Sequence, residues 1–246
     1  MRIGICDWGI GGLGFYKLLR AARPDVDVVY LGDQGFTPYG RVSTPVLTDR
    51  IRWVLQGFKD RGADRIVVAC NAASTVLDQA IVPGLNTCGV IRPALAKIAL
   101  DQRPVAVIGG RRTILSGSYR RPLQAMGIQV SQRVAQPLSG LIEAGKADDP
   151  STHDLVRSIL RPLRRSPRLV LACTHYIVLE PVVLEFMPDV EIIDPATEVW
   201  AKMAEELPAP SSRIGSSQFY TTGAADEMSR QSHAAFDVAA KVERWS

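Results

Sequence analysis

The stretch 65-RIVVACNAAS-74 decides the fold, and 168-RLVLACTHYI-177 repeats its plan: an arginine, an apolar run, Ala-Cys, and a polar residue. Short β-branched apolar runs of this kind predict buried strands. Cys70 and Cys173 therefore each stand where a strand gives way to a helix. Open α/β sheets bind their ligands at such strand ends. Because the two copies lie 103 residues apart (173 minus 70), they suggest two similar half-domains that face each other.

Strands and helices alternate along the rest of the chain. Apolar runs predict buried strands at Arg2–Cys6, Val26–Leu31, Arg65–Ala69, Pro104–Ile108, Arg168–Ala172 and Val190–Ile193. Helical periodicity predicts helices at Gly12–Ala22, Val46–Arg61, Pro93–Leu100, Leu155–Arg164 and Glu198–Glu206. Such alternation is typical of parallel sheets with helices on both faces. The predicted fold class is α/β.

Composition excludes several classes of protein. The 246 residues carry a formal net charge of +4, and the densest basic stretch, 157–168, has no aromatics between its arginines, so no nucleic-acid partner is expected. No window approaches the roughly 18 apolar residues of a membrane helix, so no membrane partner is expected and the cytoplasm is the default location. The four cysteines form no CxxC pair, which argues against zinc. Cys6 and Cys88 are expected to pack in the core.

The first loop matches GxGxxG literally, from Gly9 to Gly14, and Asp33 follows near the end of the second predicted strand. This pattern is the dinucleotide-binding fingerprint. However, Asp7 and Trp8 separate the strand from the first glycine, and the Asp7 carboxylate would repel a pyrophosphate. We therefore expect the glycines to permit a tight turn that brings backbone N–H groups near a small ligand.

Two thiols at facing strand ends suit proton transfer at a carbon atom. Inverting an α-carbon requires a base on one face and an acid on the other, and cysteine can serve as either if its pKa approaches neutrality. The predicted helix start after Cys70 is expected to lower the pKa of that thiol. His175 is expected to act likewise on Cys173, because it lies two residues away.

Seven blocks in order resemble glutamate racemases of the aspartate/glutamate racemase family. Two of them, VACNAAS and ACTHYIVL, contain Cys70 and Cys173 and resemble the family's CNTAS and GCTHYPLL. The other five are ICDWGIGGL, YLGDQGFTPYG, GVIRPALA, VIGGRRTILSGSY and PLSGLIEAG. The resemblance covers almost the whole chain and identifies it as a member of that family.

The resemblance implies two pseudo-symmetric parallel-sheet α/β domains with the active site in the cleft between them. We place the first domain at residues 1–91 plus 208–246 and the second at 92–207. The resemblance also implies an amino-acid racemase that uses no pyridoxal phosphate, metal or nucleotide. Such an enzyme binds a small amino-acid substrate and forms a homodimer. Conversion of L- to D-glutamate for peptidoglycan is the leading role.

The resemblance further implies a role for each matching side chain. Cys70 matches the base that removes the α-proton of the D-enantiomer, and Cys173 matches the base for the L-enantiomer. Three polar residues match those that assist the thiols, namely Asp7, Glu143 and His175. The substrate-binding positions are Trp8, Pro38, Tyr39, Gly40, Asn71, Ala72, Thr113 and Thr174, and the backbone of Pro38–Gly40 matches the loop that receives a substrate carboxylate.

Some positions depart from the family pattern. Trp8 replaces a serine that follows the opening aspartate, Ala72 replaces the threonine of CNTAS, and Arg92 replaces a glutamate. The first two remove hydroxyls that are expected at the substrate, and the indole is expected to reshape the pocket. Two alternatives to glutamate racemisation therefore stay open: a racemase acting on aspartate or another amino acid, and a catalytically silent relative that binds a ligand.

Overall fold

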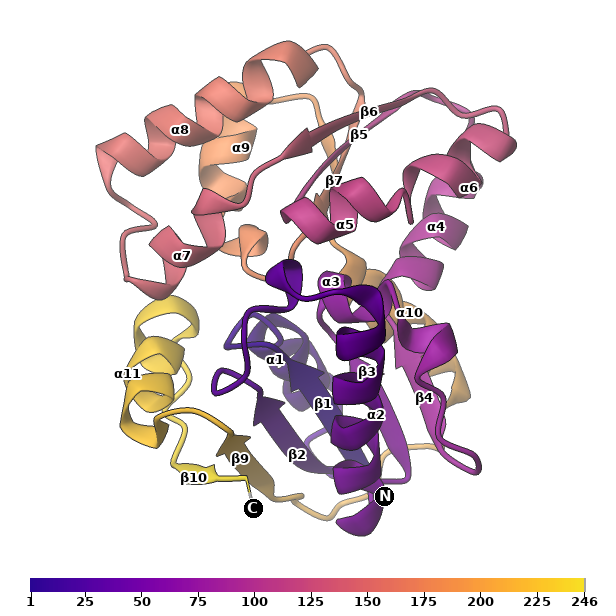
Figure 1. The fold of residues 1–246 in the computed structure, drawn as a ribbon, viewed down its shortest axis with the longest axis vertical. Coiled ribbons are helices and arrows are strands. Elements are labelled where there is room, and N and C mark those ends of the chain that lie inside the picture. Colours follow the sequence, from indigo (N-terminus) through magenta and orange to yellow (C-terminus); the bar gives the residue numbers. More distant parts are fainter. Residues whose placement is uncertain (246) are drawn as a thin grey trace.

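Two sheets, all of whose strands run parallel, form the framework of the chain (Figure 1). A computed structural model describes residues 1–245. In these residues the first sheet has six strands in the order β10-β9-β2-β1-β3-β4. Its strands are β1 (Arg2–Asp7), β2 (Asp27–Gly32), β3 (Arg65–Val68), β4 (Asn86–Gly89), β9 (Ser217–Thr221) and β10 (Val242–Arg244). It thus combines the two ends of the chain.

The second sheet lies in the middle of the sequence. Its four described strands follow the order β6-β5-β7-β8 and comprise β5 (Val105–Gly109), β6 (Val130–Val134), β7 (Arg168–Ala172) and β8 (Glu191–Ile193). Both sheets are parallel and belong to one α/β chain, so the predicted fold class is confirmed. The predicted domain boundaries are compatible with this division, but they stay a prediction.

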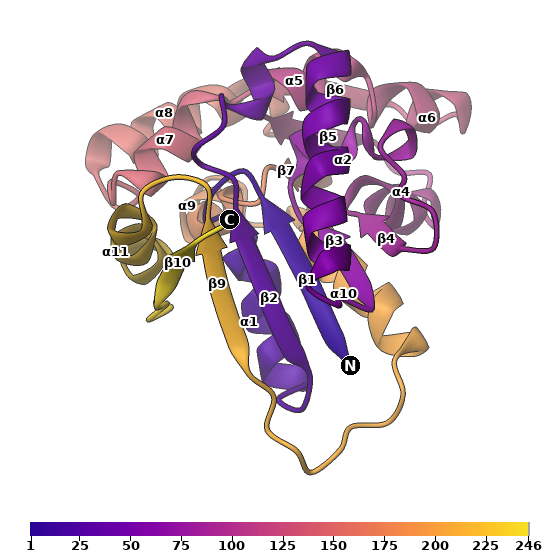
Figure 2. The ribbon, with the colours of Figure 1, turned by 60° about the horizontal axis from the view of Figure 1, so that its bottom comes forward.

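Helices cover both faces of the first sheet, as Figure 2 shows for α1 (Leu13–Ala22) and α2 (Thr44–Asp60). Successive residues of a strand point to opposite faces. Ile3 and Ile5 of β1 accordingly pack in the core shared with α1, whereas Cys6 packs in the core under α2. Gly4 belongs to the α2 face, and a Cβ there would lie 2.7 Å from the Phe58 ring. The small residue lets α2 lie close to the sheet.

Of the remaining helices, α3 and α11 connect strands of the first sheet, and the others surround the second sheet or join the two sheets (Figure 1). They are α3 (Asn71–Ser74), α4 (Ile91–Ala99), α5 (Arg111–Ser116), α6 (Arg120–Ala125), α7 (Pro137–Glu143), α8 (Pro150–Leu160), α9 (Glu180–Phe186), α10 (Pro195–Glu206) and α11 (Ala225–Phe236). Short 3-10 segments are η1 (Tyr39–Arg41), η2 (Leu77–Gln79), η3 (Arg161–Leu163) and η4 (Tyr176–Leu179). No helix within residues 1–245 is long and apolar enough to cross a membrane.

All six predicted strands and all five predicted helices are present, with ends shifted by up to five residues. Four strands were missed: β4, β6, β9 and β10. Three of these are edge strands, which have one neighbour and therefore need no apolar run. The polar sequence of β6 (VSQRV) and the Asn and Gly of β4 are poor strand formers.

Asp33, just beyond β2, joins three segments at the carboxyl edge of the first sheet. Its side chain is fully buried and accepts two hydrogen bonds from the Arg50 guanidinium of α2. It also accepts one from the Tyr39 hydroxyl at 2.7 Å and one from Thr222 at 2.7 Å. Each carboxylate oxygen thus has two donors, and the 38–40 loop is fixed against the sheet.

We expect Asp33→Ala to lower the free energy of unfolding by about 3 kcal/mol, because it leaves the Arg50 charge without its partner. Asp49→Ala removes an exposed partner of Arg52 on the same helix, and we expect no measurable change. Urea unfolding of the two variants measures both effects. If Asp33→Ala lowered the free energy of unfolding no more than Asp49→Ala does, the Asp33 network would not stabilise this edge.

Candidate active site

A cavity of about 610 Å³, counting its open mouth, lies where the carboxyl ends of strands from both sheets meet. Every residue that the sequence assigned to catalysis or substrate binding lines it. These are Asp7, Trp8, Pro38, Tyr39, Gly40, Cys70, Asn71, Ala72, Thr113, Glu143, Cys173, Thr174 and His175. Residues of the first sheet and its loops thus share one cavity with residues that follow β5 and β7.

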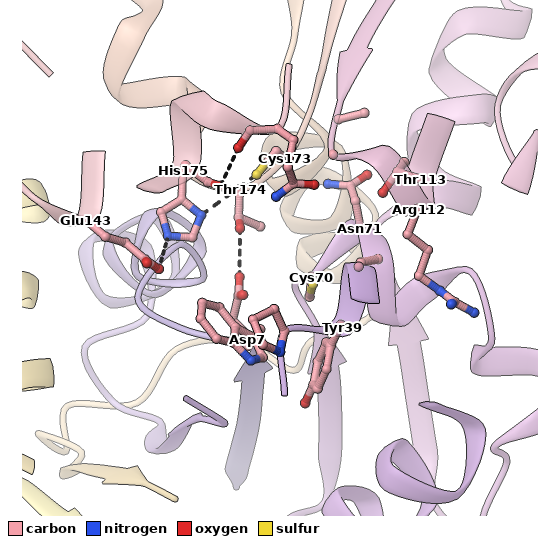
Figure 3. A pocket seen from close by; sticks show the side chains of 18 residues that line it. Asp7, Tyr39, Cys70, Asn71, Arg112, Thr113, Glu143, Cys173, Thr174 and His175 are labelled. Atoms are coloured by element: carbon pink, nitrogen blue, oxygen red, sulfur yellow. Dashed lines mark hydrogen bonds and ion pairs between the residues drawn. The ribbon is translucent and has the colours of Figure 1, made fainter. Parts of the chain in front are cut away.

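The two predicted thiols point into the cavity from opposite walls (Figure 3). Cys70 directly precedes α3 and is buried, and Cys173 directly follows β7 and is half-buried. The backbone N–H of Ser74 donates to the Cys70 carbonyl, which closes the first turn of the helix. Because each cysteine follows a strand of a different sheet, a ligand in the cavity would have one sulfur on either side.

Cys173 adjoins a pair of ionisable side chains, the buried His175 and the half-buried Glu143. Its sulfur lies 3.8 Å from Nδ1 of His175, and Nε2 of the same ring lies 2.9 Å from a Glu143 oxygen. Burial lowers the pKa of His175, but its hydrogen bonds to Cys173 and Glu143 outweigh this and raise the pKa well above its usual value. The imidazole therefore holds a proton beside the Cys173 sulfur.

An anionic group adjoins Cys70 instead. The buried Asp7 carboxylate accepts a hydrogen bond from the Thr174 hydroxyl at 2.7 Å and one from the Gly9 N–H at 3.3 Å. Burial raises the pKa of Asp7, against the opposing influence of His175 and the Thr174 hydrogen bond. The Asp7–Thr174 hydrogen bond also links the loop after β1 to the loop after β7.

The expectation of a lowered thiol pKa is wrong for Cys70. Burial, and then the nearby Asp7 carboxylate, raise the pKa of Cys70 well above its usual value. The helix start that was expected to lower it belongs to α3, which has only four residues. Cys70 therefore rests as a protonated thiol, beside an anion, whereas the proton of His175 lies beside Cys173.

The 38–40 loop lines the cavity with all three of its residues. Its one long side chain, Tyr39, is buried, and the hydroxyl is engaged by Asp33. Trp8 contributes an aromatic wall, because its indole N–H donates to the Phe36 carbonyl at 3.0 Å. The Trp8 side chain thus borders the cavity with its polar atom already paired.

The glycine-rich first loop permits close approach between the two halves of the site. A Cβ at Gly11 would lie 2.2 Å from the Thr174 hydroxyl oxygen and 2.7 Å from Nδ1 of His175. A Cβ at Gly9 would lie 2.7 Å from a Glu143 oxygen. We expected these glycines to serve a turn and a ligand. The structure shows that they make room for the side chains that surround Cys173.

Sequence reasoning missed five residues of the cavity wall, namely Gly110, Arg112, Gln136, Ser139 and Ala172. A signal existed for Ser139, which lies four residues before Glu143 and so on the same face of α7. Arg112 carried no signal beyond its place next to Thr113. Its guanidinium donates to the Val42 carbonyl, Thr44 and Thr75, and so ties α5 to segments of the first sheet's half.

The other cysteines and Arg92 lie outside the cavity wall. Cys6 is buried in the core, as predicted. Cys88 packs against the core but is only half-buried, because it lies on the edge strand β4 and also lines a second cavity between β4, α4 and α10. Arg92 forms an exposed ion pair with Asp78. Within residues 1–245, no group of three or more His, Cys, Asp or Glu side chains could hold a metal ion.

Comparison with known proteins places the chain among racemases. The family model for Asp/Glu/Hydantoin racemases matches residues 17–204. The chain is 37% identical to the glutamate racemase of Aquifex pyrophilus over 202 residues, which covers 79% of this chain and 78% of that protein. It is 31% identical to that of Aquifex aeolicus over 235 residues, covering 94% and 92%. The glutamate racemase of Thermus thermophilus, solved with β-chloro-D-alanine, superposes with a TM-score of 0.86 at 28% identity, over 99% and 96% of the two chains.

We expect Gly11→Ala to lower the free energy of unfolding by about 2 kcal/mol, because the new methyl group meets Thr174 and His175 at overlapping distances. Gly14→Ala, in the first turn of α1, is the matched control. A Cβ there lies 3.7 Å from Ile177, an ordinary contact, and we expect a gain of about 0.5 kcal/mol. Chemical denaturation measures both, and a tolerated Gly11→Ala would refute the close approach.

We expect Asp7→Asn to make the Cys70 thiol ionise at lower pH. The substitution removes the negative charge that raises the Cys70 pKa and keeps a side chain of the same shape. The pH dependence of iodoacetamide alkylation, with mass spectrometry to assign each cysteine, gives the midpoint for Cys70. A midpoint unchanged from the wild-type protein would show that Asp7 does not act on this thiol.

Proposed function

This chain belongs to the Asp/Glu/Hydantoin racemase family, and we propose that it interconverts L- and D-glutamate by proton transfer between Cys70 and Cys173. The observation that carries the proposal is the placement of the two thiols on opposite walls of one cavity, each at the end of a strand. The names of the similar proteins support glutamate as the substrate.

The L-enantiomer reacts first with Cys173. The thiolate of Cys173 removes the α-proton. The electron pair of the breaking C–H bond passes into the carboxylate group and forms an enolate. The Cys70 thiol then donates its proton to the opposite face of the α-carbon. The products are the D-enantiomer, a Cys173 thiol and a Cys70 thiolate, so one proton has been taken up and one released. The reverse reaction exchanges these roles.

The surroundings of the two thiols prepare them for this order. The raised pKa of His175 keeps a cation beside Cys173, where it compensates the charge of a thiolate, and Glu143 holds the ring in place. Burial and Asp7 keep Cys70 protonated, which is the form that an acid requires. These surroundings suit the order of proton transfers proposed for the L-enantiomer.

The cavity wall also accounts for substrate binding. The 38–40 loop lines the cavity, and in this proposal its backbone receives one carboxylate of glutamate. Asn71, Thr113 and Thr174 line the space around the thiols and orient the group that carries the reacting carbon. Binding at both ends fixes the α-carbon between the two sulfurs, which is the geometry that proton transfer needs.

A second candidate function is racemisation of a different amino acid by the same two thiols. The specific observation is that Trp8 and Ala72 both line the cavity, where the family pattern has hydroxyls. An indole without a free donor and a methyl group favour a smaller or more apolar substrate side chain. In this case aspartate or an apolar amino acid would turn over faster than glutamate.

The biological setting follows from the product. D-glutamate is a peptidoglycan component, so we propose that the protein supplies this precursor. The homodimer and the cytoplasmic location that the family resemblance implies remain predictions.

We expect purified protein, without an added cofactor, to convert L-glutamate to D-glutamate, as measured by chiral chromatography. Cys70→Ser or Cys173→Ser should each lower kcat at least 1000-fold, because a serine hydroxyl is a far weaker acid than a thiol. Cys88→Ser is the matched control: this half-buried cysteine lies in the second cavity, and turnover should be retained.

A panel of amino acids separates the candidates. Turnover led by glutamate supports the first function, and turnover led by aspartate or an apolar amino acid supports the second. If no amino acid is racemised by the folded wild-type protein, both are refuted and the chain is a binding relative.

A further inference from the structure

The side-chain amide of Asn71 is paired at one end only. Asn71 is 3% exposed, lines the cavity next to Cys70, and points into it (Figure 3). Its Oδ1 atom accepts a hydrogen bond of 2.8 Å from the Tyr119 hydroxyl. Its Nδ2 atom is buried and has no hydrogen-bond partner among the described residues. A buried amide nitrogen without an acceptor is costly, and an acceptor on a ligand bound in the cavity would remove that cost.

Several other donors in the cavity wall already form hydrogen bonds within the protein. The Thr174 hydroxyl donates to Asp7, and the Trp8 indole N–H donates to Phe36. The three nitrogen atoms of the Arg112 guanidinium each donate a hydrogen bond to a neighbouring protein oxygen. The Asn71 NH₂ group differs from these because neither of its two N–H bonds has an acceptor among the described residues.

Tyr119 decides which end of the amide faces the cavity. Its side chain is fully buried, and it reaches Asn71 from the other half of the molecule, where it directly precedes α6. Burial raises the pKa of the Tyr119 phenol, so the hydroxyl keeps its proton and can donate it. If the Asn71 amide turned by half a rotation, its NH₂ group would lie next to the Tyr119 hydroxyl. The hydroxyl proton would then lose Oδ1 as its acceptor.

We infer that Tyr119 is a positioning residue that locks the Asn71 amide with its NH₂ group toward the substrate, where the acceptor is a carboxylate oxygen. This inference rests on the proposed function. Without the phenol, the amide can turn and present its carbonyl oxygen to the carboxylate, which is repulsive. Because the Tyr119–Asn71 hydrogen bond joins the two halves of the molecule, the lock also requires the cavity to be assembled.

Tyr119→Phe tests the lock with the loss of a single oxygen atom. We expect the KM for both enantiomers of glutamate to rise about tenfold, as for the loss of one hydrogen bond to a charged group. The kcat should stay within about threefold, because the thiols and their neighbours are untouched. Calorimetric titration with D-glutamate should show a parallel weakening of the dissociation constant.

Tyr16→Phe is the matched control. Its hydroxyl also forms a hydrogen bond to a side chain, Ser217, at 3.1 Å, but it lies outside the cavity wall. We expect its KM and kcat to match those of the wild-type protein. Thermal unfolding of both variants identifies any rise in KM that follows from a loss of folding.

Two variants of Asn71 separate positioning from general structural support. In an Asn71→Ala background, adding Tyr119→Phe should raise KM no further, because the phenol acts through the amide. Asn71→Asp keeps the acceptor for Tyr119 but replaces the NH₂ group with an oxygen, and KM should rise more than tenfold. This second variant tests the lock even where Tyr119→Phe unfolds.

The outcomes distinguish this inference from the proposed function. If the wild-type protein racemises glutamate but Tyr119→Phe leaves KM within twofold, or if the two substitutions are additive, the positioning role is wrong and the function stands. If the wild-type protein neither racemises nor binds glutamate, the proposed function and this inference both fail.

Discussion

The site depends on the close approach of the loop after β1 to the side chains that surround Cys173. Gly9 and Gly11 have no Cβ where Glu143, Thr174 and His175 pass within contact distance. That approach lets the Thr174 hydroxyl reach the Asp7 carboxylate, so that the two halves of the molecule meet through a buried hydrogen bond. A larger residue in this loop would separate the walls of the cavity, and with them the two thiols.

Bringing the walls together also makes the two thiols chemically different. The first sheet contributes Cys70 with a carboxylate beside it, and the second contributes Cys173 with a protonated imidazole beside it. A racemase needs one acid and one base in each direction, and under the proposed mechanism the unlike neighbours of the two thiols favour Cys70 as the acid and Cys173 as the base for the L-enantiomer. The near-repeat in the sequence thus supplies similar strand ends, while the residues around them supply the asymmetry.

Local sequence predicted the strands and helices with strong periodicity, and the recurrence of Ala-Cys after an apolar run predicted where the thiols lie. The family resemblance was needed for Asp7 and Glu143, whose single-residue contexts are ordinary. Two features could not be read locally. The raised pKa of Cys70 depends on burial against Asp7, which is 63 residues away (70 minus 7). The closeness of Gly11 to Thr174 depends on how the two sheets pack. Edge strands such as β6 were missed because an exposed edge imposes no apolar pattern.

The isotope content of the first product formed in deuterated water tests most directly whether two thiols act from opposite faces. The reaction of unlabelled L-glutamate is stopped when a few per cent of it has been converted. The enantiomers are then separated, and the isotope at the α-position of each is determined by mass spectrometry. Two opposed thiols predict deuterium in the D-glutamate and protium in the remaining L-glutamate, because the donating thiol carries a deuteron taken up from the solvent. D-glutamate that retains the original proton would show that a single base serves both faces, and would contradict the account.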